Sequence, residues 1–177
     1  MDVGWSSEMA TVVSVDIGVK NTAFCVVHGN RVVAWWIFGV SSRVAFDKTV
    51  DRFCQELHEK FPTRPDVVVI ERQMCQNRKA SVLSHAIQAW FRGRYNTEVK
   101  FYSPKTRNVE IHKLLGRPYT KCSYKVRKAL AVQAAYKLLD GDLICPTALR
   151  TSFNEAKKKD DLADALVQAV FEIRVSG

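Results

Sequence analysis

The sequence predicts an α/β protein with a mixed five-stranded sheet and helices on its faces. Short β-branched and apolar runs alternate with longer stretches in which apolar residues recur at helical spacing. The first three strand-like runs have only short connections between them, which is typical of an antiparallel meander. The chain has 177 residues, 47% of them hydrophobic, so we expect residues 1–177 to form one domain around a sizeable core.

The meander is predicted near the start of the chain, after residues 1–9, which we expect to be frayed. Its strands are Thr11–Asp16, Thr22–Val27 and Val32–Phe38. The first strand is a β-branched run that fits a buried position. The segment His28–Arg31 contains Gly and Asn and predicts a hairpin turn. Trp35 and Trp36 are adjacent, so their side chains should face opposite sides of the sheet.

Helices and strands alternate over the middle of the chain. The predicted elements are a helix over Ala45–Lys60, a strand over Asp66–Ile70, a helix over Lys79–Tyr95 and a strand over Val99–Tyr102. The residues expected to face the core are Phe46, Val50, Phe53 and Leu57 in the first helix, and Val82, Ala86, Ile87 and Trp90 in the second. The run that follows Asp66 is wholly apolar, so this strand should be central and parallel to the first.

Three further helices are expected, over Lys105–Leu115, Ser123–Leu139 and Asp160–Arg174. Gly116 and Pro118 separate the first two. The segment Leu143–Thr151 favours neither helix nor strand. The predicted order is therefore β-β-β-α-β-α-β-α-α-α, without repeats or linkers.

Charge and cysteine content restrict the possible functions. The chain carries 27 Lys and Arg against 18 Asp and Glu, a formal net charge of +9, which favours a polyanionic partner such as nucleic acid. Basic character without a specific partner is the alternative. The five cysteines include no CxxC pair and the four histidines are scattered, so we expect free thiols and no zinc site. No apolar run reaches the roughly 18 residues of a membrane span, and no secretory signal is visible, so we expect an intracellular, soluble protein without a membrane partner.

Carboxylates are concentrated where a core-facing helix begins. Asp160, Asp161 and Asp164 fall within five residues, and the last two lie three apart on one helical face that continues into an apolar run. Carboxylates directed toward a core need a cation. Asp16 and Glu71 each lie at the polar end of an apolar strand. Together these acids predict a divalent-metal site.

Such a set suits phosphodiester hydrolysis. Two Mg²⁺ ions about 3.5–4 Å apart can activate water and stabilise the leaving oxygen, and Mg²⁺ prefers oxygen ligands. Asp16, on the predicted central strand, is the candidate to bridge both ions. Each acid also has a structural explanation: Asp16 as a strand end, Glu71 as an ion-pair partner of Arg72, and Asp160 as a helix cap. Asp164 within the apolar run is not explained in this way.

The ordered segments containing these acids resemble motifs of RuvC-type Holliday junction resolvases, particularly the poxvirus resolvases. The segments are Val13–Gly18, Val69–Gln73 and Lys159–Leu166. The resemblance extends from residue 11 to about residue 172. It implies an RNase H-like fold, a homodimer and symmetric nicking of four-way DNA junctions, with Mg²⁺ as cofactor, Mn²⁺ as a substitute and no small-molecule cofactor. It further implies resolution of viral DNA concatemers in the host-cell cytoplasm.

Carried over by motif, the implied catalytic and metal-binding residues are Asp16, Glu71, Asp161 and Asp164. The Asp-x-x-Asp spacing selects Asp161, although Asp160 is close enough to keep that choice open. Bacterial relatives use a basic residue near the site, for which no counterpart is assigned here.

Basic residues around these motifs are the candidates for DNA contact: Arg72, Arg78, Lys79, Lys105, Lys121, Lys125, Lys128, Lys157, Lys158 and Lys159. The apolar residues of the predicted helix over Lys79–Tyr95 are a candidate dimer interface, or pack on their own sheet. Alternatives to a resolvase are an RNA–DNA hybrid nuclease of the same fold and a non-catalytic nucleic-acid-binding module. An actin-like ATPase is disfavoured because the chain is too short for a second lobe.

Overall fold

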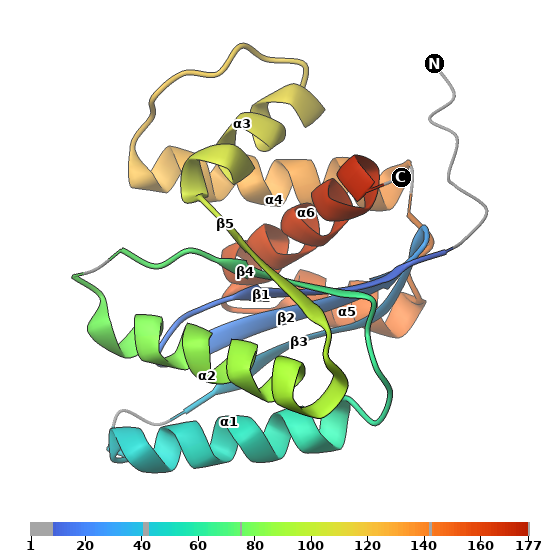
Figure 1. Ribbon diagram of the computed structural model, residues 1–177. Helices are drawn as coiled ribbons and strands as arrows, with labels where there is room; N and C mark the ends of the chain where they lie inside the picture. The colour runs from blue at the N-terminus through green and yellow to red at the C-terminus, as the bar shows by residue number, and fades with distance from the viewer. Residues whose placement is uncertain (1–8, 41–42, 75, 142, 177) are drawn as a thin grey trace.

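The computed structural model describes residues 9–40, 43–74, 76–141 and 143–176. The expected fraying over residues 1–9 falls almost entirely outside these ranges. Within them the chain forms a five-stranded sheet in the order β3-β2-β1-β4-β5 (Figure 1). The strands are β1 (Thr11–Asp16), β2 (Asn21–His28), β3 (Arg31–Gly39), β4 (Val67–Glu71) and β5 (Glu98–Tyr102).

The sheet is mixed, as predicted. β1, β2 and β3 form the antiparallel meander, whereas β4 runs parallel to β1 and β5 runs parallel to β4. Gly29, with a φ of +55°, forms the turn between β2 and β3 in the left-handed conformation that glycine tolerates. β1 is the central strand, so Asp16 at its end lies at the middle of the sheet edge.

Helices cover both faces of the sheet (Figure 1). They are α1 (Phe46–Lys60), α2 (Arg78–Tyr95), α3 (Pro104–Leu114), α4 (Tyr124–Asp140), α5 (Thr147–Glu155) and α6 (Lys159–Ser176). α1 and α2 pack on one face, and α6, with α4 and α5 against it, packs on the other. None of the described helices is both long and apolar enough to cross a bilayer.

Two hydrophobic cores follow from the alternation of side chains along the strands. Trp35 belongs to the core beneath α6, and Trp36 packs against the core beneath α1, which confirms that they face opposite sides. α6 is buried over most of its length from Leu162 to Val170. This apolar helix is consequently held firmly on the sheet, and it carries the C-terminal acids.

Two expectations about the helices are wrong. The predicted order omits α5, because its apolar face is reduced to Phe153 as its one fully buried side chain and gives little periodic signal. In α2, Val82 is 51% exposed, and the buried positions include Leu83, Ile87 and Phe91. Ile87 and Phe91 pack in the chain's own core. For these two residues, the prediction that the helix packs on its own sheet is confirmed. The other predicted elements agree with the structure to within two residues at each end.

Candidate active site

The ends of two parallel strands bring Asp16 and Glu71 together. Val15 of β1 is paired with Ile70 of β4, so the next residue on each strand is Asp16 and Glu71. Two residues after Asp16, position 18 requires glycine, because a Cβ there would lie 2.2 Å from the carbonyl oxygen of Asn21. Burial, followed by the neighbouring Glu71 carboxyl, raises the pKa of Asp16 well above its usual value.

α6 adds Asp164 to the same edge of the sheet. The helix begins at Lys159, and its first turn is anchored by Trp35, whose Nε1–H donates to the carbonyl oxygen of Leu162 at 3.0 Å. Asp164 is only 4% exposed. It projects from the core-facing side of the helix, as its position within the apolar run predicts.

A single buried guanidinium joins these three carboxylates. Arg107 Nη1 lies 3.6 Å from Asp16 Oδ1, its Nη2 lies 3.3 Å from Glu71 Oε1, and its Nε lies 3.4 Å from Asp164 Oδ1. Arg107 is on α3, a helix capped by the Ser103 hydroxyl, which accepts from the Thr106 amide. Its Nε and Nη1 are buried without a well-formed hydrogen bond, so these contacts are mainly electrostatic.

A second cation, Lys128 of α4, holds the acids of α6. Its Nζ lies 2.8 Å from Asp160 Oδ2, 2.7 Å from Asp161 Oδ1 and 3.6 Å from Asp164 Oδ2. Lys128 and Arg107 therefore both contact Asp164, from opposite carboxylate oxygens. We refer to Asp16, Glu71, Asp160, Asp161 and Asp164 as the acid cluster.

The charges in the cluster perturb one another. Burial is the main effect that raises the pKa of Asp164, to about 7, although both cations oppose it. Burial alone would lower the pKa of Arg107 and of Lys128, but the surrounding carboxylates outweigh it and both are raised. Burial, the largest single effect, would raise the pKa of Asp160, but the hydrogen bond and charge of Lys128, a backbone hydrogen bond and the charge of Lys158 together outweigh it, so the pKa is lowered. Both bases are therefore protonated and neutralise part of the cluster.

The cluster has the donor chemistry of a hard divalent cation, since all five of its side chains offer carboxylate oxygens. Among the described residues, however, no three Asp, Glu, His or Cys side chains converge closely enough to hold a metal ion as they stand. Arg107 and Lys128 instead make the charge-compensating contacts. The carboxylates fit a divalent metal once these two cations give up part of their contacts.

The four predicted site residues are thus brought to one place, and two features were missed. Arg107 was not among the predicted site residues, and Lys128 was assigned only to DNA contact. A helical signal was available for each: Arg107 lies four residues before the buried Ile111, and Lys128 lies three before the buried Ala131. Asp160 and Asp161 both contact Lys128, so the contacts alone do not choose between them.

The other basic residues predicted to contact DNA lie outside the cluster. Most of them are exposed: Arg72, Arg78, Lys79, Lys105, Lys121, Lys125, Lys157 and Lys158. Lys159 is half-buried, and its Nζ lies 5.9 Å from the ring centroid of Phe153. None of these nine makes a salt bridge within the described part of the chain. They are free to meet an external anion.

The sheet order and the helical layers define a RuvC-like fold of the RNase H-like class. The fowlpox virus resolvase, solved with its substrate Holliday junction DNA, matches with a TM-score of 0.63 at 19% identity over 94% of this chain and 98% of that one. T. thermophilus RuvC, also solved with a Holliday junction, matches with a TM-score of 0.63 at 19% identity over 94% of both chains. The chain belongs to the family described as "Poxvirus A22 protein", whose family model matches residues 10–173.

Two curated viral proteins are also similar to this chain. Uncharacterized protein 170L of Invertebrate iridescent virus 6 is 29% identical over 130 residues, which cover 64% of this chain and 52% of that protein. Uncharacterized protein 97L of Invertebrate iridescent virus 3 is 32% identical over 122 residues, which cover 67% of this chain and 51% of that protein. The chain spans about half the length of these curated relatives.

Proposed function

We propose that this chain is a Holliday junction resolvase, a divalent-metal-dependent endonuclease that nicks four-way and other branched DNA. The observation that carries the proposal is the convergence of Asp16, Glu71 and Asp164 on Arg107 at the end of the central strands. The family membership and the fold shared with nucleases support it. The basic surface supplies the complement to a DNA backbone.

Asp16, Glu71, Asp161 and Asp164 would hold Mg²⁺, with Mn²⁺ as a substitute. Bound in pairs, such ions lower the pKa of a water nucleophile and neutralise charge on the leaving oxygen. The chain's own part is to keep these carboxylates on rigid elements, two strand ends and a buried helix. Exposed lysines and arginines around the edge would hold the phosphates on either side of the cut.

Arg107 and Lys128 would have a role already in the metal-free protein. They keep the mutually repelling acids together in the metal-free protein. With a metal bound to the carboxylates, both side chains would be available to an anionic phosphate. They would then orient the phosphate and balance the charge that develops during cleavage.

A four-way junction has two strands to cut at positions related by approximate two-fold symmetry. One acid cluster per chain then calls for a homodimer that makes two symmetric nicks. In a poxvirus such an enzyme would resolve replicated DNA concatemers in the host-cell cytoplasm.

The test is incubation of a labelled four-way junction with and without Mg²⁺, resolving both nicked strands. Asp16→Asn, Glu71→Gln, Asp161→Asn and Asp164→Asn should each nearly abolish nicking and leave junction binding intact. Glu59→Gln, an exposed acid on α1, is the matched control and should nick normally. Nicking by Asp164→Asn at the wild-type rate would contradict the proposed site. Equal cleavage of an RNA–DNA hybrid would favour the alternative nuclease.

A further inference from the structure

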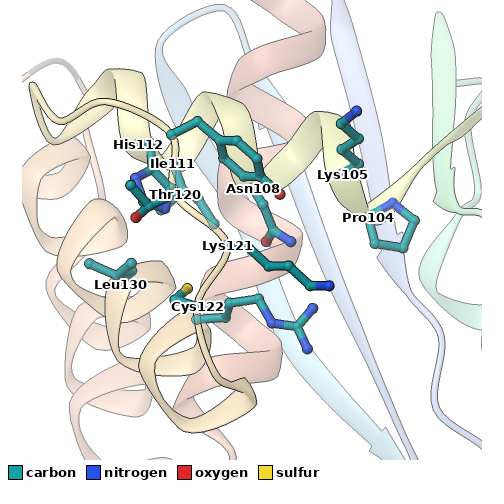
Figure 2. A pocket seen from close by; sticks show the side chains of 11 residues that line it. Pro104, Lys105, Asn108, Ile111, His112, Thr120, Lys121, Cys122 and Leu130 are labelled. Atoms are coloured by element: carbon teal, nitrogen blue, oxygen red, sulfur yellow. The ribbon is translucent and has the colours of Figure 1, made fainter.

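A recess lies between α3, the loop that follows it and α4 (Figure 2). Its volume is about 320 Å³. This lies at the lower end of the roughly 300–1,000 Å³ typical of small-molecule sites. The space would admit one planar ring system and would exclude a duplex. We refer to this recess as the α3–α4 pocket.

The pocket contains the side-chain amide of Asn108. Asn108 lines it and is 9% exposed, and its carboxamide makes no hydrogen bond to any described residue. Figure 2 shows its oxygen and nitrogen turned into the recess, on the side where Lys121 also points. Neither amide atom is fully buried without a partner, so water can satisfy the amide when the pocket is empty and a ligand can replace that water. A carboxamide offers one acceptor and one donor side by side, which matches the edge of a nucleobase.

The lining is basic and contains no acid. Lys105, Lys121 and Arg127 contribute to it, and none of them makes a salt bridge within the described ranges. The Arg127 guanidinium lies over the ring of Tyr124, 5.7 Å from the centroid. Three cations without acidic partners around an uncharged interior suit a ligand with a neutral ring and anionic phosphates.

One wall of the pocket is aromatic. Tyr119 is 44% exposed and meets His112 edge to face, with the ring centroids 5.4 Å apart. His112 Nδ1 lies 3.0 Å from the carbonyl oxygen of Pro118, which can only accept, so Nδ1 donates this hydrogen bond. The exposed part of the tyrosine ring offers a surface on which a base can stack.

The pocket and the acid cluster use adjacent residues of the same two helices. On α3, Arg107 contacts the acids and Asn108 faces the pocket. On α4, Lys128 contacts the acids and Arg127 faces the pocket. A DNA strand with one phosphate at the acid cluster would therefore place a neighbouring nucleotide at the pocket.

We infer that the α3–α4 pocket binds one unpaired nucleobase of the DNA strand that is being cut. Asn108 hydrogen-bonds the edge of the base, Tyr119 stacks on its face, and Lys105, Lys121 and Arg127 hold the flanking phosphates. This inference rests on the proposed function. The energetic cost of extruding a base is lowest where pairing is already disrupted, as at a branch point. The pocket would thus contribute to the preference for branched over continuous duplex DNA.

The test compares Asn108→Leu, which keeps the side chain's size and removes its hydrogen bonds, with the wild type. The substrates are four-way junctions in which each nucleotide near the nick is replaced in turn by an abasic site. With the wild type, one abasic position should reduce nicking roughly tenfold. Asn108→Leu should reduce nicking of the intact junction by a similar factor and be insensitive to that abasic position. Tyr119→Ala, at an exposed ring, should behave in the same way without disturbing the core.

Lys137→Ala, exposed at the far end of α4, is the control and should retain the abasic effect. If both pocket variants respond to the abasic site as the wild type does, the pocket does not bind a base. If they lose binding of free deoxynucleotides and nick all junctions normally, the pocket is a separate nucleotide site and the inference is wrong. If the wild type neither binds nor nicks a junction, the proposed function itself fails.

Discussion

Asp164 Oδ1 lies 3.4 Å from Nε of Arg107, while its Oδ2 lies 3.6 Å from Nζ of Lys128. One carboxylate therefore links the two cations that α3 and α4 direct at the acid cluster. Asp164 is held by the buried face of α6, so this contact connects the strand-end acids with the acids of the helix.

Removal of the Arg107 guanidinium should lower the unfolding free energy of the metal-free protein. Arg107→Ala leaves Asp16, Glu71 and Asp164 buried without their shared cation, so the metal-free protein should lose about 3–5 kcal/mol of unfolding free energy. Mg²⁺ no longer competes with the guanidinium and should stabilise the variant more than the wild type. Urea unfolding with and without Mg²⁺, together with calorimetric titration, measures both effects. Equal stabilisation of the two proteins by Mg²⁺ would show that Arg107 does not oppose metal binding.

The stability of the metal-free protein should depend on the ionisation of Asp164. Its pKa is about 7 in the folded state and near 3.8 when unfolded, so the folded state binds the proton more tightly. This group's effect on stability is absent below pH 3.8 and becomes increasingly unfavourable as the pH rises to 7, by at most about 4 kcal/mol. The stability of Asp164→Asn relative to the wild type should therefore increase as the pH rises across that range. Parallel denaturation curves over this pH range check this, with the exposed Asp47→Asn as control. A constant difference between Asp164→Asn and wild type would contradict the raised pKa.

Two adjacent tryptophans offer a matched comparison for the anchoring of α6. Trp35 donates its Nε1–H to the Leu162 carbonyl oxygen at 3.0 Å, and Trp36 donates to Glu56 Oε1 at 2.9 Å on the opposite face. Changing either to Phe should cost about 1 kcal/mol of stability, because the hydrogen bond is removed. Only Trp35→Phe should also weaken Mg²⁺ binding, because it loosens the turn that carries the acids of α6. Similar Mg²⁺ affinities for the two variants would indicate that this anchor does not position the site.

The three lysines that precede the acids of α6 should contribute to DNA affinity by binding phosphates. Lys157 and Lys158 are exposed, and Lys159 is half-buried at the start of the helix. Replacing all three with Ala should weaken junction binding and reduce the slope of log affinity against log salt by about 0.9 for each phosphate that is no longer neutralised. Titrations at several salt concentrations measure the slope, with Lys137→Ala as the control. An unchanged slope would remove this segment from the DNA surface.

Where patterns are local, the sequence predicted the structure closely. β-branched runs and tight turns determine the meander, and the apolar run around Asp164 determines which side of α6 is buried, because both depend on residue spacing alone. The four acids that the sequence predicts as metal ligands lie at strand ends and on a core-facing helix, and the structure brings them to one edge of the sheet. α5 was not predicted, because its one fully buried side chain, Phe153, gives no periodic signal.

The tertiary structure decided which basic side chains contact the acid cluster. Arg107 and Lys128 look like ordinary basic residues in a chain with 27 of them, and only the packing of α3 and α4 against α6 selects these two as partners of the acids. The same packing forms the recess that Asn108 lines. Helical spacing can place Arg107 and Lys128 on a core-facing side, but it cannot tell which distant residues they contact. The sequence determined which side chains are present and on which faces, and the fold determined their neighbours.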